Sequence, residues 1–256
     1  ANGAVTTKAE TLPAMNMESL EKFAGTGLDT ITTDDIATPR LKVLAQMSPE
    51  LEEIEGAKAG MIFNSVSKKA YSGQEGIKVV VCGYDKVWLE WQDRGKGSSA
   101  PVNIFSAKDK PNNAVRGDDG KFRLESGNYL EECANFYVLL LNGGVAPEPA
   151  IISMKATQLK AARSWAYSLK NEFIQNPQSK KLFLAPSWYR IYNLTTIKQS
   201  NDKGSWYGWV VNKEDFLNEE ATFDMAAGFN ESVRGGKITP KYDDDVESSK
   251  SDDTPF

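Results

Sequence analysis

The sequence contains no histidine, and this absence excludes several kinds of active site at once. A Ser-His-Asp triad, a Cys-His dyad and a histidine general base all require an imidazole. Cysteine is scarce too, since Cys82 and Cys133 are its only occurrences. Two thiols without an imidazole cannot complete a tetrahedral zinc site, and the wide separation of this pair favours buried, reduced cysteines over a disulfide scaffold. We therefore expect a binding protein rather than an enzyme, with no cofactor and no metal.

Long apolar runs are also missing. No stretch approaches the roughly 20 apolar residues that a membrane-spanning helix needs. Residues 1–16 combine neither the basic segment nor the apolar segment of a signal peptide. These absences predict a soluble protein of the cytoplasm, the host bacterial cytoplasm if a phage encodes it, that does not contact membranes.

The net charge of −5 is concentrated near one end of the sequence. Residues 243–256 carry six acidic side chains and one lysine, so this segment alone accounts for that charge. A segment so charged and so poor in apolar residues is typical of a disordered tail.

A second segment has the opposite charge and many aromatic rings. Residues 151–213 contain ten basic and only two acidic side chains, together with ten of the 26 aromatic residues. Single-stranded nucleic acids bind to such combinations, because the cations follow the phosphates and the rings stack on exposed bases. The alternative is that most of these rings belong to the core and the lysines to a solvated face.

Apolar periodicity predicts a mainly β chain with a few helices. Helices are expected at 39–47, 157–175 and 214–229. The long interval 93–132 lacks a sustained pattern and suggests a loop with a hairpin around Gly117–Gly120. Strands are expected at 61–67, 76–91, 134–141, 150–155, 188–198 and 205–211.

The order of these elements predicts the architecture. A helix before the last two strands of an antiparallel barrel is the plan of an OB-fold, which often binds oligonucleotides. We therefore expect an OB-fold-like barrel with additions at both ends. The expected divisions are an N-terminal extension with short helices at 1–60, an OB-fold-like core at 61–213 with the long loop 93–132, a helical segment at 214–242, and a disordered acidic tail at 243–256.

Four stretches of the sequence resemble a known family. The chain ends in Asp252-Asp253-Thr254-Pro255-Phe256, which is similar to the tip of bacterial single-stranded DNA-binding proteins. The stretches 39–42, 154–165 and 204–209 add a similarity to the single-stranded DNA-binding proteins of tailed phages. The chain is larger than the bacterial proteins and has a longer N-terminal part, so their tetramer is not carried over.

The resemblance implies sequence-independent binding and protection of single-stranded DNA during replication, recombination or repair. It also implies that the tail competes with DNA and recruits polymerase, helicase-primase or nuclease partners through Asp252, Asp253, Pro255 and Phe256. A homo-oligomer is compatible with the sequence. The resemblance and the strand faces together predict a DNA-binding groove. The residues expected there are Tyr84, Lys86, Trp88, Lys160, Arg163, Trp188, Arg190, Tyr192, Lys198, Trp206 and Tyr207.

Three alternatives remain open at this stage. A DNA-annealing or recombination protein would use the same chemistry, and a virion or assembly protein could use the tail as a docking peptide. A metal-dependent nuclease would need paired carboxylates, for which Glu52-Glu53 and Asp118-Asp119 are candidates. Which of Trp206, Tyr207 and Trp209 face the groove is not determined by the sequence, because neighbouring strand residues point to opposite faces.

Overall fold

The computed structural model describes residues 17–28, 30–31, 37–93, 99–141, 146–202 and 204–242. The chain divides into two units, 1–36 and 37–256, and each is described by itself. Within the described part of the first unit, helix α1 (Met17–Lys22) is followed by a series of turns. All other helices and strands belong to the second unit.

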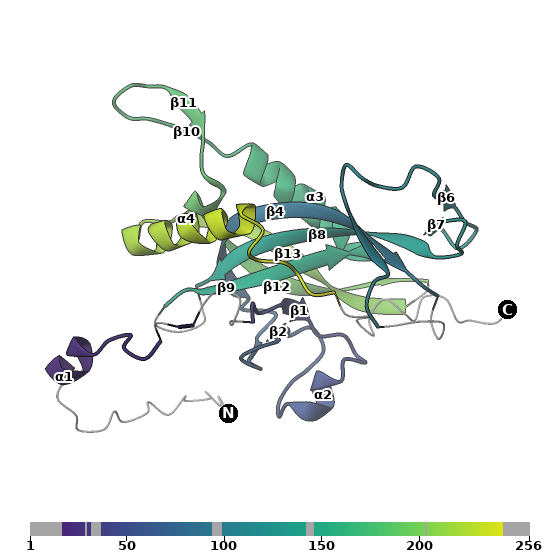
Figure 1. Ribbon diagram of the computed structural model, residues 1–256, viewed down its shortest axis with the longest axis horizontal. Helices are drawn as coiled ribbons and strands as arrows, with labels where there is room; N and C mark the ends of the chain where they lie inside the picture. Colours follow the sequence, from purple (N-terminus) through teal and green to yellow (C-terminus); the bar gives the residue numbers. More distant parts are fainter. Residues whose placement is uncertain are drawn as a thin grey trace. The chain divides into compact units, whose positions relative to one another are not determined.

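The second unit is built on one curled antiparallel sheet (Figure 1). Five long strands form its centre in the order β13-β12-β4-β8-β9. Their bounds are β4 (Ile77–Trp91), β8 (Tyr129–Leu140), β9 (Glu148–Lys155), β12 (Arg190–Asn201) and β13 (Gly204–Phe216).

Short strands extend this sheet, and others form a separate small sheet. β5 (Asn103–Ser106) pairs with β4, while β6 (Val115–Arg116) and β7 (Phe122–Arg123) form a hairpin beside β8. A separate small sheet contains β1 (Leu41–Val43), β2 (Ile62–Asn64) and β3 (Ala70–Tyr71). The chain just before β1 lies against β9, where the Ile151 amide donates to the Pro39 carbonyl. The result is the expected mainly β, OB-fold-like architecture in the form of a half-barrel.

Helices cover the sheet on both faces. α3 (Leu159–Lys170) follows the 3-10 turn η2 (Ala156–Gln158) and precedes β12 and β13, as expected of an OB-fold-like chain. α4 (Glu220–Arg234) lies on the opposite face, and Gly236, just past its C-cap Gly235, has a φ of +70° that suits glycine. The remaining elements are α2 (Glu50–Glu53), the hairpin β10 (Phe173–Gln175) and β11 (Leu182–Leu184), and the 3-10 turn η3 (Ser187–Tyr189).

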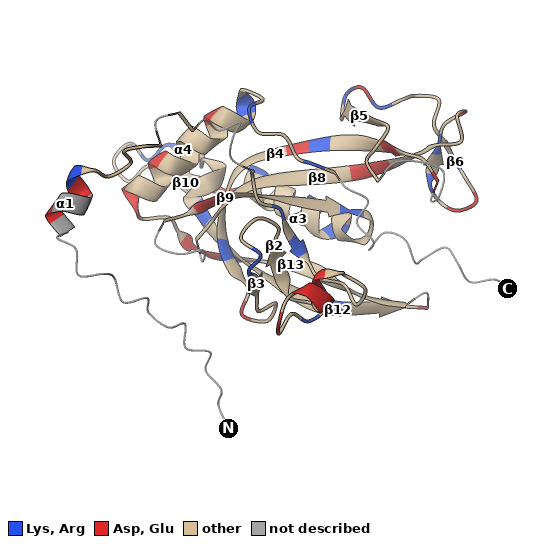
Figure 2. Cartoon of the chain, turned by 60° about the horizontal axis from the view of Figure 1, so that its bottom comes forward, with Lys and Arg blue, Asp and Glu red and all other residues tan. Residues whose placement is uncertain are grey.

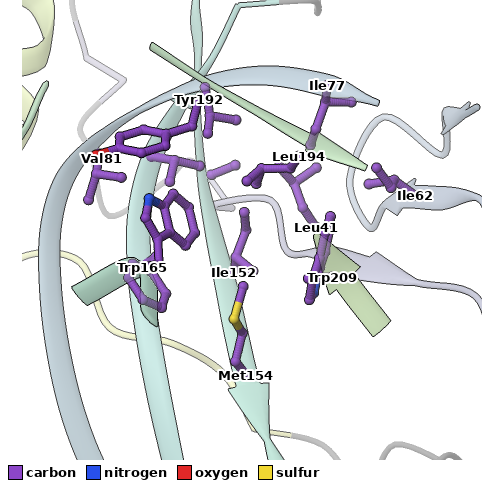
Figure 3. Packing of buried hydrophobic residues seen from close by; sticks show 14 of the residues in the cluster. Leu41, Ile62, Ile77, Val81, Ile152, Met154, Trp165, Tyr192, Leu194 and Trp209 are labelled. Carbon is purple, nitrogen blue, oxygen red and sulfur yellow. The ribbon is translucent and has the colours of Figure 1, made fainter. Parts of the chain in front are cut away.

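The inner face of the sheet carries the main core (Figure 3). Trp165 of α3 stacks on Phe136 of β8 with ring centroids 4.2 Å apart, and its edge meets Tyr192 of β12. Truncating one such buried ring to alanine typically costs about 3–5 kcal/mol. The α3–sheet contact therefore depends on a few aromatic side chains.

The outer face has its own apolar cluster beneath α4. Phe229 and Ala226 of α4 pack there against Val80 and Cys82 of β4. Both cysteines are free and buried, as expected from the sequence, and burial raises the pKa of each thiol to about 12. They are therefore inert core residues at neutral pH.

Several sequence expectations need correction. Residues 39–47 do not form a helix, because Leu41 and Val43 alternate into the core as strand β1. The helix expected at 157–175 ends at Lys170, and 173–175 form strand β10. The hairpin expected around Gly117–Gly120 is confirmed as β6–β7.

Candidate functional site

A groove lies where three segments distant in sequence meet. It is lined by residues 40–45 around β1, by 153 and 155–158 at the end of β9 and in η2, and by Trp206, Tyr207 and Trp209 of β13. Glu131 of β8 completes the lining, and the volume is about 130 Å³. These segments overlap the three body stretches that carry the resemblance noted in the sequence.

Three aromatic residues of the groove lining differ in how deeply they are buried. Trp209 is buried in the main core, whereas Trp206 and Tyr207 are half-buried. The Trp206 indole Nε1 donates to Gln199 Oε1 at 3.0 Å. Tyr207 packs over Gly60, where an added Cβ would lie 2.5 Å from the ring. All three residues belong to the groove lining, and Trp206 and Tyr207 are partly exposed.

Basic residues surround these rings. Arg40, Lys42 and Lys155 line the groove, against the single carboxylate of Glu131. Each cation is held in place: Lys42 Nζ lies 2.9 Å from Glu50, Lys155 Nζ lies 3.7 Å from Glu131, and Arg40 donates to the Lys241 carbonyl. These three residues are absent from the site expected from the sequence, although Arg40, Lys42 and Lys155 all lie in the resembling stretches.

A second group of selected residues lies on the inner face of β4. Lys86 Nζ and Arg163 Nη2 both contact the Glu132 carboxylate, at 3.6 and 3.0 Å. Tyr84 is 44% exposed and its ring contacts Phe136. The structure therefore brings Tyr84, Lys86 and Arg163 close to the same carboxylate.

Trp88 shares this face but is covered. Lys110 Nζ lies 4.1 Å above the Trp88 ring, and Phe122 meets the ring edge-on. Only 8% of Trp88 is exposed. The expectation that this ring stands open on a polar face is wrong, because Lys110, before β6, and Phe122 of β7 cover it.

The residues expected on one face of 188–198 are separated. Tyr192 is fully buried in the main core, while Trp188 packs on the outer face against Phe223 of α4. Residues 187–189 form the turn η3, and a bulge follows between Arg190 and Tyr192, so the strand alternation does not extend back to Trp188. The shared exposed face expected for these rings is therefore wrong.

The other selected residues of this region have distinct environments. Arg190 pairs with Glu172 and lies 3.6 Å over the Phe216 ring. Lys198 is exposed opposite Tyr207, and Lys160 is exposed on α3. Asp252, Asp253, Pro255 and Phe256 lie outside the described residues.

Three further exposed aromatic rings are absent from the site expected from the sequence. Tyr167 is 72% exposed, Phe173 57% and Phe183 41%. The signal for Tyr167 was its position beside Lys160, Arg163 and Lys170 on one flank of the expected helix. Phe173 carries no such signal, because it continues the apolar spacing of the expected helix.

The carboxylate pairs do not build a metal site among the described residues. No group of three or more His, Cys, Asp or Glu side chains gathers there. The Arg123 guanidinium donates a hydrogen bond to the Asp119 carboxylate, and this bond lowers the pKa of that carboxyl. Among the same residues, no helix combines the length and the apolar character that crossing a bilayer requires.

Comparison with known proteins places the chain in a phage family. Residues 7–239 match the family model described as "Pam3 phage gp34-like protein". No curated protein and no solved structure matches the chain. Since the matched region covers nearly all of the sequence, including every strand of the half-barrel, the chain belongs to the Pam3 phage gp34-like family.

Proposed function

We propose that this protein binds single-stranded DNA independently of sequence and protects it during phage DNA replication, recombination or repair. The observation that carries the proposal is the groove, whose lining combines Trp206 and Tyr207 with Arg40, Lys42 and Lys155. Rings that stack on bases and cations that follow phosphates are the two components of non-specific single-strand binding. Membership of a phage family is consistent with this role.

The size of the groove limits what it can hold. A dry cavity of about 150 Å³ accommodates one benzene ring, so a groove of about 130 Å³ is too small for more than one base. One base would insert beside Trp206, and the neighbouring nucleotides would follow the surface. Every base has a π-face, so this contact does not select a sequence.

The groove lysines are already paired with carboxylates, which is compatible with a polyanionic ligand. Lys42 and Lys155 already face carboxylates, at Glu50 and Glu131, and a phosphate would exchange one anionic partner for another. Their positions are thus fixed before the ligand arrives, which reduces the entropy lost on binding. The partner-recruiting role of residues 243–256 belongs to the same proposal and rests on the sequence alone.

Titration of a dye-labelled oligo-dT, followed by fluorescence anisotropy over a series of salt concentrations, tests the proposal. We expect tight binding to oligo-dT and weaker binding to a duplex of equal length. If the three groove cations each neutralise a phosphate, the logarithm of affinity falls with the logarithm of salt with a slope of about −2 or steeper. Equal affinity for duplex, or an affinity that does not depend on salt, would contradict the proposal.

A further inference from the structure

A second basic and aromatic surface lies apart from the groove, on residues 160–184. It comprises the exposed side of α3 and the β10–β11 hairpin, which extends from the end of that helix (Figure 1). We call these residues the arm. The β10–β11 hairpin is a two-stranded sheet of its own and pairs with no other strand among the described residues. An isolated hairpin is only marginally stable in water, so a partner that packs on it would stabilise it.

The charge of the arm is strongly positive. It carries five basic side chains and one acid, Glu172. Glu172 is largely buried at the base of the hairpin, where Arg190 and Lys213 both contact its carboxylate. Within the described part of the chain, the ammonium groups of four lysines form no ion pair: Lys160, Lys170, Lys180 and Lys181.

These lysines are presented in a defined geometry. Lys160, Arg163, Tyr167 and Lys170 recur at helical spacing and form the solvent side of α3, where Figure 2 shows basic residues in blue. The hairpin tip is ordered by Asn176, whose side-chain oxygen accepts from the amides of Gln178 and Ser179. The arm is therefore a structured surface with unpaired cations.

Three exposed rings stand between these cations. Tyr167, Phe173 and Phe183 are all exposed, and none contacts another ring in the described chain. Phe173 and Phe183 lie on paired strands and point to opposite faces of the hairpin, since Phe183 faces Ile174 and Phe173 faces Leu184. The rings can therefore stack on bases from more than one side.

We infer that the arm is a second contact surface for single-stranded DNA, with phosphates along the four lysines and bases on the three rings. This inference rests on the proposed function and extends it from one base in the groove to a longer segment of strand. A second copy of the chain is the other natural occupant of an apolar hairpin. A symmetric dimer, however, uses the same patch on both copies, and that would bring two strongly positive arms together.

The decisive variants remove one property each. Lys170→Gln, Lys180→Gln and Lys181→Gln together remove three charges and keep a polar side chain that is only one atom shorter. Tyr167→Leu, Phe173→Leu and Phe183→Leu together remove the aromatic rings and keep apolar side chains that a protein contact could still use. Lys69→Gln, Lys108→Gln and Lys237→Gln form the matched control, because these exposed lysines have no ion pair in the described chain and lie outside the arm.

Affinity for oligo-dT, its salt dependence and the sedimentation coefficient are measured for every variant. We expect the lysine triple to reduce the salt slope by about 2, since each lost phosphate contact changes the slope by about 0.7, while the control leaves it unchanged. The leucine triple is expected to lower affinity about fivefold or more for each ring that stacks.

Two results would overturn the inference while leaving the proposed function intact. In one, both arm variants bind oligo-dT as the intact chain does. In the other, they leave DNA affinity unchanged but lower the sedimentation coefficient, which assigns the arm to self-association. If the intact chain itself fails to bind oligo-dT, the proposed function fails and the inference fails with it.

Discussion

At the scale of single residues, the Tyr192 hydroxyl is buried in the main core with no hydrogen-bond partner among the described residues. Burial raises the pKa of Tyr192 to about 12, so the group stays protonated. The ring itself contacts Trp165 of α3. The structural contribution of this residue therefore comes from its ring and not from its polar atom.

We predict opposite effects for two substitutions at this position. Tyr192→Ala should lower the free energy of unfolding by about 3–5 kcal/mol, because a cavity replaces the ring. Tyr192→Phe should leave stability unchanged or raise it by up to about 1 kcal/mol, because an unpaired buried hydroxyl is removed. Urea unfolding followed by circular dichroism measures both. If Tyr192→Ala is folded with unchanged stability but binds DNA weakly, the Tyr192 ring contacts DNA and is not a core residue.

Glu172 is the residue that fixes the base of the arm. Burial disfavours its carboxylate, but hydrogen bonds from Arg190 and Lys213 outweigh burial and lower the pKa of this group. A carboxyl whose pKa is lower in the folded state stabilises the fold above its unfolded pKa, about 4.3. That contribution is lost as the pH falls through the folded pKa.

We therefore predict that Glu172→Gln lowers the free energy of unfolding by about 2 kcal/mol at neutral pH. The difference from the intact chain should shrink as the pH falls below about 4. Urea unfolding at a series of pH values checks this, with Glu125→Gln as the control for an exposed carboxylate that has no ion pair in the described chain. A difference that stays constant with pH would argue against the ion pairs.

At the scale of elements, alternation and helical spacing were informative where one pattern ran through a whole element. The long strand expected at 76–91 is β4 at 77–91, and that expected at 150–155 is β9 at 148–155. The pattern failed where two elements share one apolar stripe. Phe173 continues the stripe of Leu169, yet Asn171 has left the helical conformation and the chain enters a hairpin.

The same limit applies to the candidate site. Alternation correctly placed Tyr84, Lys86 and Trp88 on one face of β4, but it could not show that Lys110 and Phe122 cover Trp88. Cover of this kind comes from a segment distant in sequence. The groove is likewise formed by segments far apart in the chain, so no local pattern selected Arg40 as a lining residue.

The turn before β2 supports the groove through Gly60. Its φ is +89°, and an added Cβ would lie 2.5 Å from the Tyr207 ring. Gly60→Ala should cost about 1–2 kcal/mol in backbone strain and should also displace the ring, lowering oligo-dT affinity. Gly56→Ala is the matched control, because φ is +80° there and no atom lies within 4 Å of the added Cβ.

We expect both alanine variants to lose stability in thermal unfolding. Only Gly60→Ala should lose affinity beyond what its fraction of unfolded protein explains. Equal affinities for the two folded variants would mean that the position of Tyr207 does not matter for binding.

At the scale of the whole molecule, charge is divided between the basic segment 151–213 and residues 243–256, which carry −5. A tethered polyanion can reach a local concentration near millimolar and compete with DNA despite weak intrinsic affinity. Removing 243–256 should therefore tighten oligo-dT binding at low salt, and the gain should shrink as salt screens the competition. Anisotropy titration checks this.

The appropriate control keeps the tail length and replaces its acidic residues with Asn and Gln. It should bind like the shortened chain, because the competition depends on charge. If the shortened chain binds DNA more weakly than the intact one, the tail does not compete with DNA but increases the affinity for it.

The central claim is that single-stranded DNA occupies the groove between β1, η2 and β13. Photocrosslinking of the intact chain to a bromodeoxyuridine-substituted oligo-dT, with the modified peptides identified by mass spectrometry, tests that location directly. We predict adducts on Trp206 or Tyr207 that disappear when unlabelled oligo-dT is added in excess. The account would be contradicted if the oligonucleotide binds but residues 40–45, 153–158 and 206–209 carry no adduct that excess unsubstituted oligo-dT removes.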